Sequence, residues 1–166
     1  MPEPTFDPEA ILATLERYSV RYVLIGGLAA TLYGSPHVTT DVDITPSTDA
    51  GNLALLADAL VDLDARLRVE NEPAGVPFDR SAEALAGATI WNLVTRYGAL
   101  DLTLVPSGTT GFDDLRRDAV EITIRETRVV VASLADIIRS KEAADREKDR
   151  LTLPTLRRIL EEESEG

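Results

Sequence analysis

Two aspartates separated by one residue, Asp41 and Asp43, lie in the segment VTTDVDIT at residues 38–45. In a β-strand, side chains alternate between faces, so both carboxylates would point to one side, and Val42 and Ile44 to the other. Two carboxylates this close repel each other unless one takes up a proton or a cation stabilises both. Mg²⁺ suits such a site because it prefers carboxylate oxygens. The alternative is a solvated edge strand whose acids prevent aggregation, and for this short motif alone that alternative is the more common one.

A third acid of the same kind, Asp101, lies in the segment LDLTLV at residues 100–105. The leucines of this segment would share one strand face, with Asp101 on the other. Burying an ionised acid in so apolar a strand costs free energy unless the acid is paired, protonated or bound to a metal. The alternative is that this face of the strand is exposed to solvent. If this strand neighbours that of Asp41 and Asp43, three carboxylates converge. Such a group could hold the two metal ions that activate an attacking oxygen and stabilise a leaving pyrophosphate.

Two glycines, Gly26 and Gly27, follow the predicted strand at residues 21–25 and precede a short predicted helix at residues 28–33. Because they have no side chains, a ligand can approach the backbone there, and the N-terminus of the helix offers free N–H groups to phosphate. An isolated Gly-Gly pair is more commonly a tight turn.

Lys141 falls on the apolar face of a helix predicted to begin after Ser133 and to run to about Lys148. From that face its amine could extend into a cleft. The alternative is a lysine that extends to solvent and pairs with Asp145, one turn further on. Three other acids of this region are expected on the helix surface, namely Asp136, Glu142 and Asp149.

A scaffold of interleaved helices and strands is predicted to position these residues. Helices are expected at residues 7–18, 28–33, 48–63, 111–119 and 133–148, with a last one starting at Pro154. Strands are expected at residues 21–25, 41–44, 66–69, 89–95, 99–105, 120–124 and 128–131. Residues 71–87 are left unassigned. Because the elements follow no strict βαβ rhythm, we predict an α+β (α/β) fold with a mixed β-sheet flanked by helices and with C-terminal helices.

The length of 166 residues fits a single domain, with a core at about residues 20–132 and a C-terminal helical segment at about 133–163. The absence of cysteine excludes disulfides and thiolate metal sites. No secretory signal and no bilayer-length apolar run is found, so we expect a cytoplasmic protein without a membrane partner. The net charge of −12 argues against a broad nucleic-acid surface. Local basic residues could still gather beside a cleft, namely Arg139, Lys141, Arg146, Lys148 and Arg150.

In their order along the chain, these features resemble the minimal nucleotidyltransferase fold of the DNA polymerase beta-like superfamily. The stretches GGLAATLYGSPHVTTDVDI, LDLTLVP and SLADIIRSKEAADREKDRLTLPTLRRIL carry the resemblance. It is closest to the bacterial AbiEii-like group, several of which are toxin components of toxin–antitoxin pairs. The resemblance implies a transferase that attaches a nucleotide from an NTP such as ATP to an acceptor hydroxyl and releases pyrophosphate. Two Mg²⁺ ions are the implied cofactors, with Mn²⁺ as a substitute.

The resemblance also implies roles for individual residues. Asp41 and Asp43 would bind both metal ions, and Asp101 would complete the second metal site and help to deprotonate the acceptor. The phosphates would contact Gly26, Gly27 and Lys141.

Two positions depart from the pattern of the family. Gly27 stands where many members have serine, and His37 stands where related sequences often carry arginine. His37 is therefore a candidate nucleotide-binding residue or general base, or else an exposed loop histidine.

The resemblance leaves the acceptor open among transfer RNA, a protein hydroxyl and a small molecule such as an aminoglycoside. A cognate antitoxin would be a further partner. Two other functions fit the sequence. One is a catalytically inactive nucleotidyltransferase-like module that binds a nucleotide or a protein. The other is a plain interaction module whose acids are only surface charge.

Overall fold

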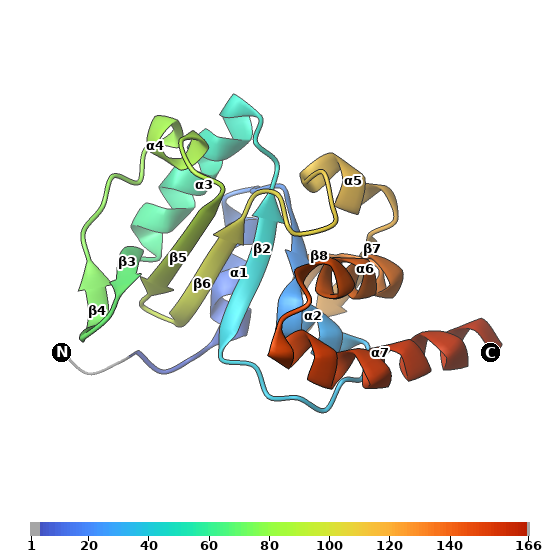
Figure 1. Ribbon diagram of the computed structural model, residues 1–166. Coiled ribbons are helices and arrows are strands. Elements are labelled where there is room, and N and C mark those ends of the chain that lie inside the picture. Colours follow the sequence, from blue (N-terminus) through green and yellow to red (C-terminus); the bar gives the residue numbers. More distant parts are fainter. Residues whose placement is uncertain (1–3, 166) are drawn as a thin grey trace.

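The computed structural model describes residues 4–165, which form one mixed β-sheet of eight strands with seven helices around it (Figure 1). The strand order is β4-β3-β5-β6-β2-β1-β8-β7. The strands are β1 (Tyr22–Ile25), β2 (Asp41–Pro46), β3 (Arg66–Val69), β4 (Glu72–Val76), β5 (Ile90–Thr95), β6 (Gly98–Thr103), β7 (Val120–Ile124) and β8 (Thr127–Val131). The helices are α1 (Pro8–Arg17), α2 (Gly26–Leu32), α3 (Ala50–Asp62), α4 (Ala82–Ala86), α5 (Phe112–Arg117), α6 (Leu134–Ala144) and α7 (Glu147–Glu165).

The sheet combines parallel and antiparallel pairs. β2 pairs with β6 and β1 pairs with β8 in parallel, whereas the other neighbours are antiparallel. The predicted mixed sheet flanked by helices is therefore confirmed. None of the helices within residues 4–165 combines the length and the apolar composition needed to span a bilayer.

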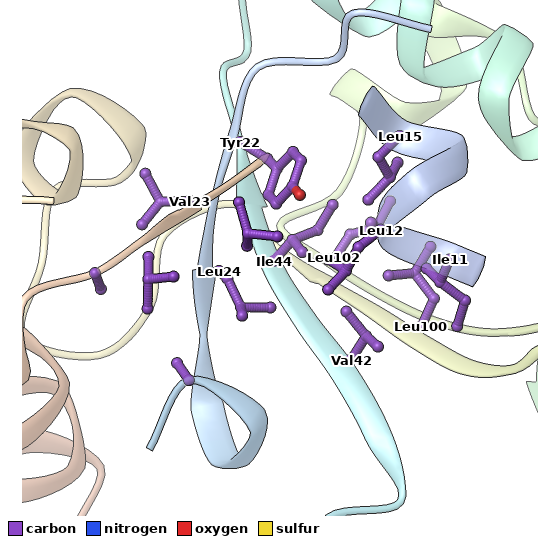
Figure 2. Close-up of a cluster of buried hydrophobic side chains, with 14 of the residues drawn as sticks. Ile11, Leu12, Leu15, Tyr22, Val23, Leu24, Val42, Ile44, Leu100 and Leu102 are labelled. Atoms are coloured by element: carbon purple, nitrogen blue, oxygen red, sulfur yellow. The ribbon is translucent and has the colours of Figure 1, made fainter. Parts of the chain in front are cut away.

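One face of the central strands forms the hydrophobic core. Val42 and Ile44 from β2 and Leu100 and Leu102 from β6 are fully buried there, against the apolar side of α1 (Figure 2). That side of α1 consists of Ile11, Leu12 and Leu15. Since strand side chains alternate, the acids between these core residues must point to the opposite face. The apolar contacts of the core therefore fix the direction of the acidic side chains.

The predicted C-terminal helices were wrong in their boundaries. A helix was expected to run to Lys148, but α6 ends at Ala144, and Asp145 adopts a left-handed conformation with φ 48°. The next helix begins at Glu147, and Pro154 lies inside it, not at its start. Asp149 explains the new start, because its carboxylate accepts a hydrogen bond from the Arg146 N–H at 3.2 Å and so caps the first turn of α7.

Two other segments also differ from the sequence prediction. The unassigned stretch at residues 71–87 contains β4 and α4. α2 begins at Gly26, so the two glycines form its first residues instead of a separate turn.

Candidate active site

Three carboxylates meet on the face of the sheet that lies opposite the core. β2 and β6 run parallel with Asp43 directly beside Asp101, and Asp41 lies two residues before Asp43 on the same face of β2. Carboxylate oxygens of the three residues all lie within 4.8 Å of one another. The convergence predicted from the sequence therefore occurs, because these two strands are neighbours in the sheet.

The three acids carry more negative charge than their surroundings offset. Burial, together with the charges of Asp41 and Asp101, raises the pKa of Asp43 to about 7. Burial also raises the pKa of Asp101, although the Arg68 guanidinium opposes this effect. A cation between the acids would relieve this electrostatic cost.

Arg68, on β3, is part of the site and was not identified from the sequence. Its guanidinium Nη2 donates to Asp101 Oδ1 at 2.8 Å, and its Nη1 donates to the Leu93 carbonyl at 3.3 Å. The side chain crosses β5 to reach β6, as the strand order allows. No local pattern marks Arg68, because the contact depends on a strand order that composition and periodicity do not reveal.

The acids line a cleft of about 480 Å³, which Gly26 and Gly27 border on the side of β1. Gly26 has φ +75°, and a Cβ atom at this position would overlap the Asp43 carboxylate. A Cβ atom at Gly27 would come within 3.2 Å of Thr39 Oγ1. The two glycines therefore bring the backbone at the start of α2 into close contact with the acidic site.

Three cationic side chains line the same cleft from the C-terminal helices, namely Lys141, Arg146 and Lys148. Behind them lies Asp149, whose side chain is fully buried. Its carboxylate accepts from Arg146 Nε at 2.8 Å and lies 3.5 Å from Lys141 Nζ. Burial would raise the pKa of Asp149, but the hydrogen bonds from Arg146 outweigh it, so that this pKa is lowered. Asp149 thus joins Lys141 and Arg146 at the break between α6 and α7.

Several predictions for this segment need correction. Asp149 was expected on the helix surface but is buried, because it caps α7 and pairs with two cations. Asp136 was also expected there, but it lines the cleft and pairs with Arg139 at 3.1 Å. Lys141 pairs with Asp149 and not with Asp145, because the helix breaks between the two acids. Only Glu142 is confirmed as a surface acid, with 49% of its side chain exposed.

The structure does not bring His37 to the other candidate residues. It is exposed in the loop before β2 and does not line the cleft. Of the basic residues that could have gathered beside the cleft, Arg139 and Arg150 do not line it either. Six of the seven predicted site residues therefore share the cleft, namely Gly26, Gly27, Asp41, Asp43, Asp101 and Lys141.

The chemistry of the acidic site fits Mg²⁺ or Mn²⁺. All of its donors are carboxylate oxygens, which hard divalent cations prefer, and they are close enough to share ions. Burial, followed by the charges of Asp41 and Asp101, raises the pKa of Asp43, so a cation bound there would favour its ionised form. Asp41, Asp43 and Asp101 are the residues that would hold the metal.

Solved structures with the same fold are nucleotidyltransferases. The lincosamide antibiotic adenylyltransferase LnuA, solved with lincomycin bound, superimposes with a TM-score of 0.61 at 18% identity, over 95% of this chain and 99% of LnuA. ANT(2'')-Ia, solved in complex with adenylyl-2''-tobramycin, gives a TM-score of 0.58 at 16% identity, over 92% of this chain and 87% of that one. The chain has the nucleotidyltransferase fold.

A third structure with this fold is a protein from Thermotoga maritima described as a candidate nucleotidyltransferase. Its TM-score is 0.52 at 16% identity, over 96% of this chain and 97% of that chain. No protein-family model and no curated protein sequence matches the chain. The likeness is therefore one of fold, and the function has to be argued from the site.

Proposed function

We propose that the protein is a metal-dependent nucleotidyltransferase, which transfers a nucleotide from an NTP to an acceptor hydroxyl and releases pyrophosphate. The observation that carries this proposal is the arrangement of charge across one cleft. The clustered carboxylates of Asp41, Asp43 and Asp101 share a cleft of about 480 Å³ with three cationic side chains, in a chain with the nucleotidyltransferase fold. Carboxylates can hold divalent metal ions and cations can hold phosphate oxygens, so an NTP–metal complex complements both sides.

The residues of the cleft divide the work of the reaction. Bound metal would supply charge stabilisation at the transferred phosphoryl group and activation of the attacking hydroxyl. Asp41, Asp43 and Asp101 would hold the metal through their carboxylate oxygens, and Asp101 would also take the proton of the acceptor hydroxyl. Lys141 and Arg146 bind and orient the triphosphate, while Gly26 and Gly27 let it approach the backbone. Positioning and electrostatics of this kind account for most of the rate gain in phosphoryl transfer.

A small molecule is the acceptor class that the solved structures favour, since LnuA was solved with lincomycin and ANT(2'')-Ia with adenylyl-2''-tobramycin. Membership of the AbiEii-like group, a toxin–antitoxin role with an antitoxin partner, and a cytoplasmic location rest on the sequence alone and stay hypotheses. Transfer RNA and protein hydroxyls are the competing acceptors.

The test is a pyrophosphate-release assay with each NTP, MgCl₂ and cell extract as the source of acceptor. The wild-type chain should release pyrophosphate and attach the labelled nucleotide to a component of the extract, and Asp41→Asn should do neither. Asp58→Asn is the matched control, because it makes the same substitution at an exposed position of α3. Equal rates for the Asp41 variant and the wild type would refute the mechanism.

The second candidate function is nucleotide binding without catalysis. The Arg68–Asp101 ion pair favours it, because the guanidinium already satisfies part of one metal-binding carboxylate. Calorimetry with NTP and MgCl₂ distinguishes the two functions when it is combined with the release assay. Binding without any pyrophosphate release would support the second candidate.

A further inference from the structure

Beyond Asp101, the face of the sheet formed by β5 and β3 has no role in the mechanism above. A polar row crosses the sheet here. Asn92 on β5 lies beside Asp101, which lies beside Asp43. Since Leu67 pairs with Leu93, the antiparallel register brings Arg68 next to Asn92. Arg68, Asn92, Asp101 and Asp43 thus point to the same face of the sheet from four adjacent strands.

This part of the face is accessible to a ligand. In Figure 1, α6 and α7 lie on the side of the molecule where α2 and β8 are, and no helix passes in front of β5 and β6. Ile90 is 57% exposed, and the Arg68 side chain is 39% exposed. Three residues continue the cleft beyond Asp101, namely Ile90, Asn92 and Thr103. The side chains of Asn92 and Thr103 make no hydrogen bond to any residue between 4 and 165, so their polar groups are free to bind a ligand.

The geometry of phosphoryl transfer assigns this surface to the acceptor. The attacking and leaving oxygens lie roughly in line on opposite sides of the phosphorus. If Lys141 and Arg146 hold the triphosphate on the helix side, pyrophosphate leaves toward them. The acceptor hydroxyl must then approach from the opposite side of the acids, over β5 and β6.

The charges on this side limit the class of acceptor. A polycationic acceptor needs unpaired carboxylates, but Asp101 is already paired with Arg68 and is required by the metal. Among the cleft-lining residues of β5 and β6, Asp101 is the only acid. The remaining cleft-lining groups here are an amide, a hydroxyl and an apolar side chain, and the partly exposed guanidinium of Arg68 lies next to them, paired with Asp101. Together these groups suit a hydroxylated compound.

We propose that Arg68, Asn92, Thr103 and Ile90 form the acceptor subsite, and that it takes a small hydroxylated compound which is neutral or anionic near the reacting hydroxyl. Arg68 is the residue that selects against cations. This inference rests on the proposed function, because it needs a nucleotide to be transferred.

The first experiment separates the low-molecular-mass fraction of a cell extract into cationic, neutral and anionic pools by ion exchange. The full chain is incubated with each pool, α-labelled NTPs and MgCl₂, with tobramycin as a defined polycationic probe. Label should appear in the neutral or anionic pool. Label on tobramycin, in the cationic pool, or only on RNA or protein would overturn the assignment. If pyrophosphate is released neither with the separate pools nor with the unfractionated extract, the proposed function itself is wrong.

The second experiment uses variants with the labelled acceptor pool as substrate. Arg68→Gln and Asn92→Ala should each raise the KM for the acceptor by about tenfold or more, since each removes hydrogen bonds made to it. For Asn92→Ala the Kd for the NTP–Mg²⁺ complex should change less than about twofold, because the Asn92 side chain makes no hydrogen bond to a metal-binding carboxylate and the triphosphate lies on the other side. Arg66→Gln is the matched control on the same strand, where the Arg66 Nε donates to the Gly75 carbonyl.

A purely structural role for Arg68 gives a different pattern. If Arg68 only orients Asp101, Arg68→Gln lowers kcat and leaves the KM for the acceptor unchanged, and the assignment is wrong. Asn92 tests the subsite independently, since its side chain supports no other described residue.

Discussion

The acids on the two sides of the cleft differ in how far cationic partners offset their charge. On the sheet side, Asp41, Asp43 and Asp101 have one cationic partner between them, Arg68, and the pKa of Asp43 rises to about 7. On the helix side, the single buried acid Asp149 is satisfied by two cations and by a backbone N–H, and its pKa is lowered. The three carboxylates of the sheet side are therefore electrostatically unsatisfied in the absence of a ligand, whereas Asp149 on the helix side is satisfied.

This difference separates carboxylates that serve a ligand from a carboxylate that serves the fold. Acids that lower stability in the free protein are retained where a ligand compensates them, and such sites trade stability for activity. A buried acid with a full set of partners stabilises the conformation of its own segment. The substitution of an acid by its amide should therefore have opposite effects on stability at the two sides.

The largest effect is expected for Asp43→Asn. Without a carboxylate at this position, metal cannot be held correctly, and transfer should fall by about a thousandfold or more, because metal supplies several kcal/mol of stabilisation to the transition state. In metal-free buffer at pH 8, the same substitution should raise the free energy of unfolding by about 1 kcal/mol, because it removes a repelling charge. Pyrophosphate release and urea unfolding measure the two quantities. A loss of stability in metal-free buffer would contradict the assignment of the sheet side as unsatisfied.

The second effect is expected for Asp149→Asn on the helix side. The amide leaves Lys141 and Arg146 without their buried counter-ion, so the free energy of unfolding should fall by about 3 kcal/mol. Urea denaturation measures the change. Asp145→Asn is the control from the same segment, because Asp145 is 68% exposed and its pair with Arg150 should contribute less than about 1 kcal/mol. If both variants lose the same stability, the burial of Asp149 has no energetic consequence.

The smallest effect concerns pH. The raised pKa of Asp43 means that the native protein binds a proton that the unfolded chain has already released. This contribution to stability is complete below about pH 4 and is lost as the pH rises through about 7. Mg²⁺ must displace that proton at pH 6 but not at pH 8. MgCl₂ should therefore raise the Tm by a few degrees more at pH 8 than at pH 6.

Thermal unfolding at both pH values, with and without MgCl₂, measures this difference. Asp43→Asn should abolish the dependence of the Mg²⁺ effect on pH. An equal rise in Tm at both pH values in the wild type would show that Asp43 does not bind the metal.

The sheet side could be predicted from the sequence because its signals are local. The alternation of Val42 and Ile44 with the two acids fixes the face on which the acids lie, and the leucines around Asp101 do the same for β6. What the alternation leaves open is which strands are neighbours. The resemblance to a known family suggested that β2 and β6 are close, but nothing in the sequence indicated that β3 comes near enough for Arg68 to reach Asp101.

The helix side was predicted less well, because the ion pairs of Asp149 oppose the helical spacing of the sequence around it. Helical spacing continues through residues 141–148, and this favoured one long helix with a surface acid at its end. The ion pairs of buried Asp149 with Lys141 and Arg146 instead stabilise a break at Asp145, at the cost of a left-handed backbone conformation. A tertiary contact of this kind cannot be read from periodicity.

Gly26 and Asp43 have a consequence for recognising distant relatives of this protein. Gly26, the first residue of α2, directly follows Ile25, which pairs with Asp43 in the sheet, and the space a side chain at residue 26 would need is filled by the carboxylate. A larger residue at 26 is therefore incompatible with an acid at 43, whatever the rest of the sequence has become. At identities of 16–18%, whole-chain comparison shows only the fold. We therefore expect distant chains of this fold that keep an acid at the position of Asp43 to keep glycine at the position of Gly26.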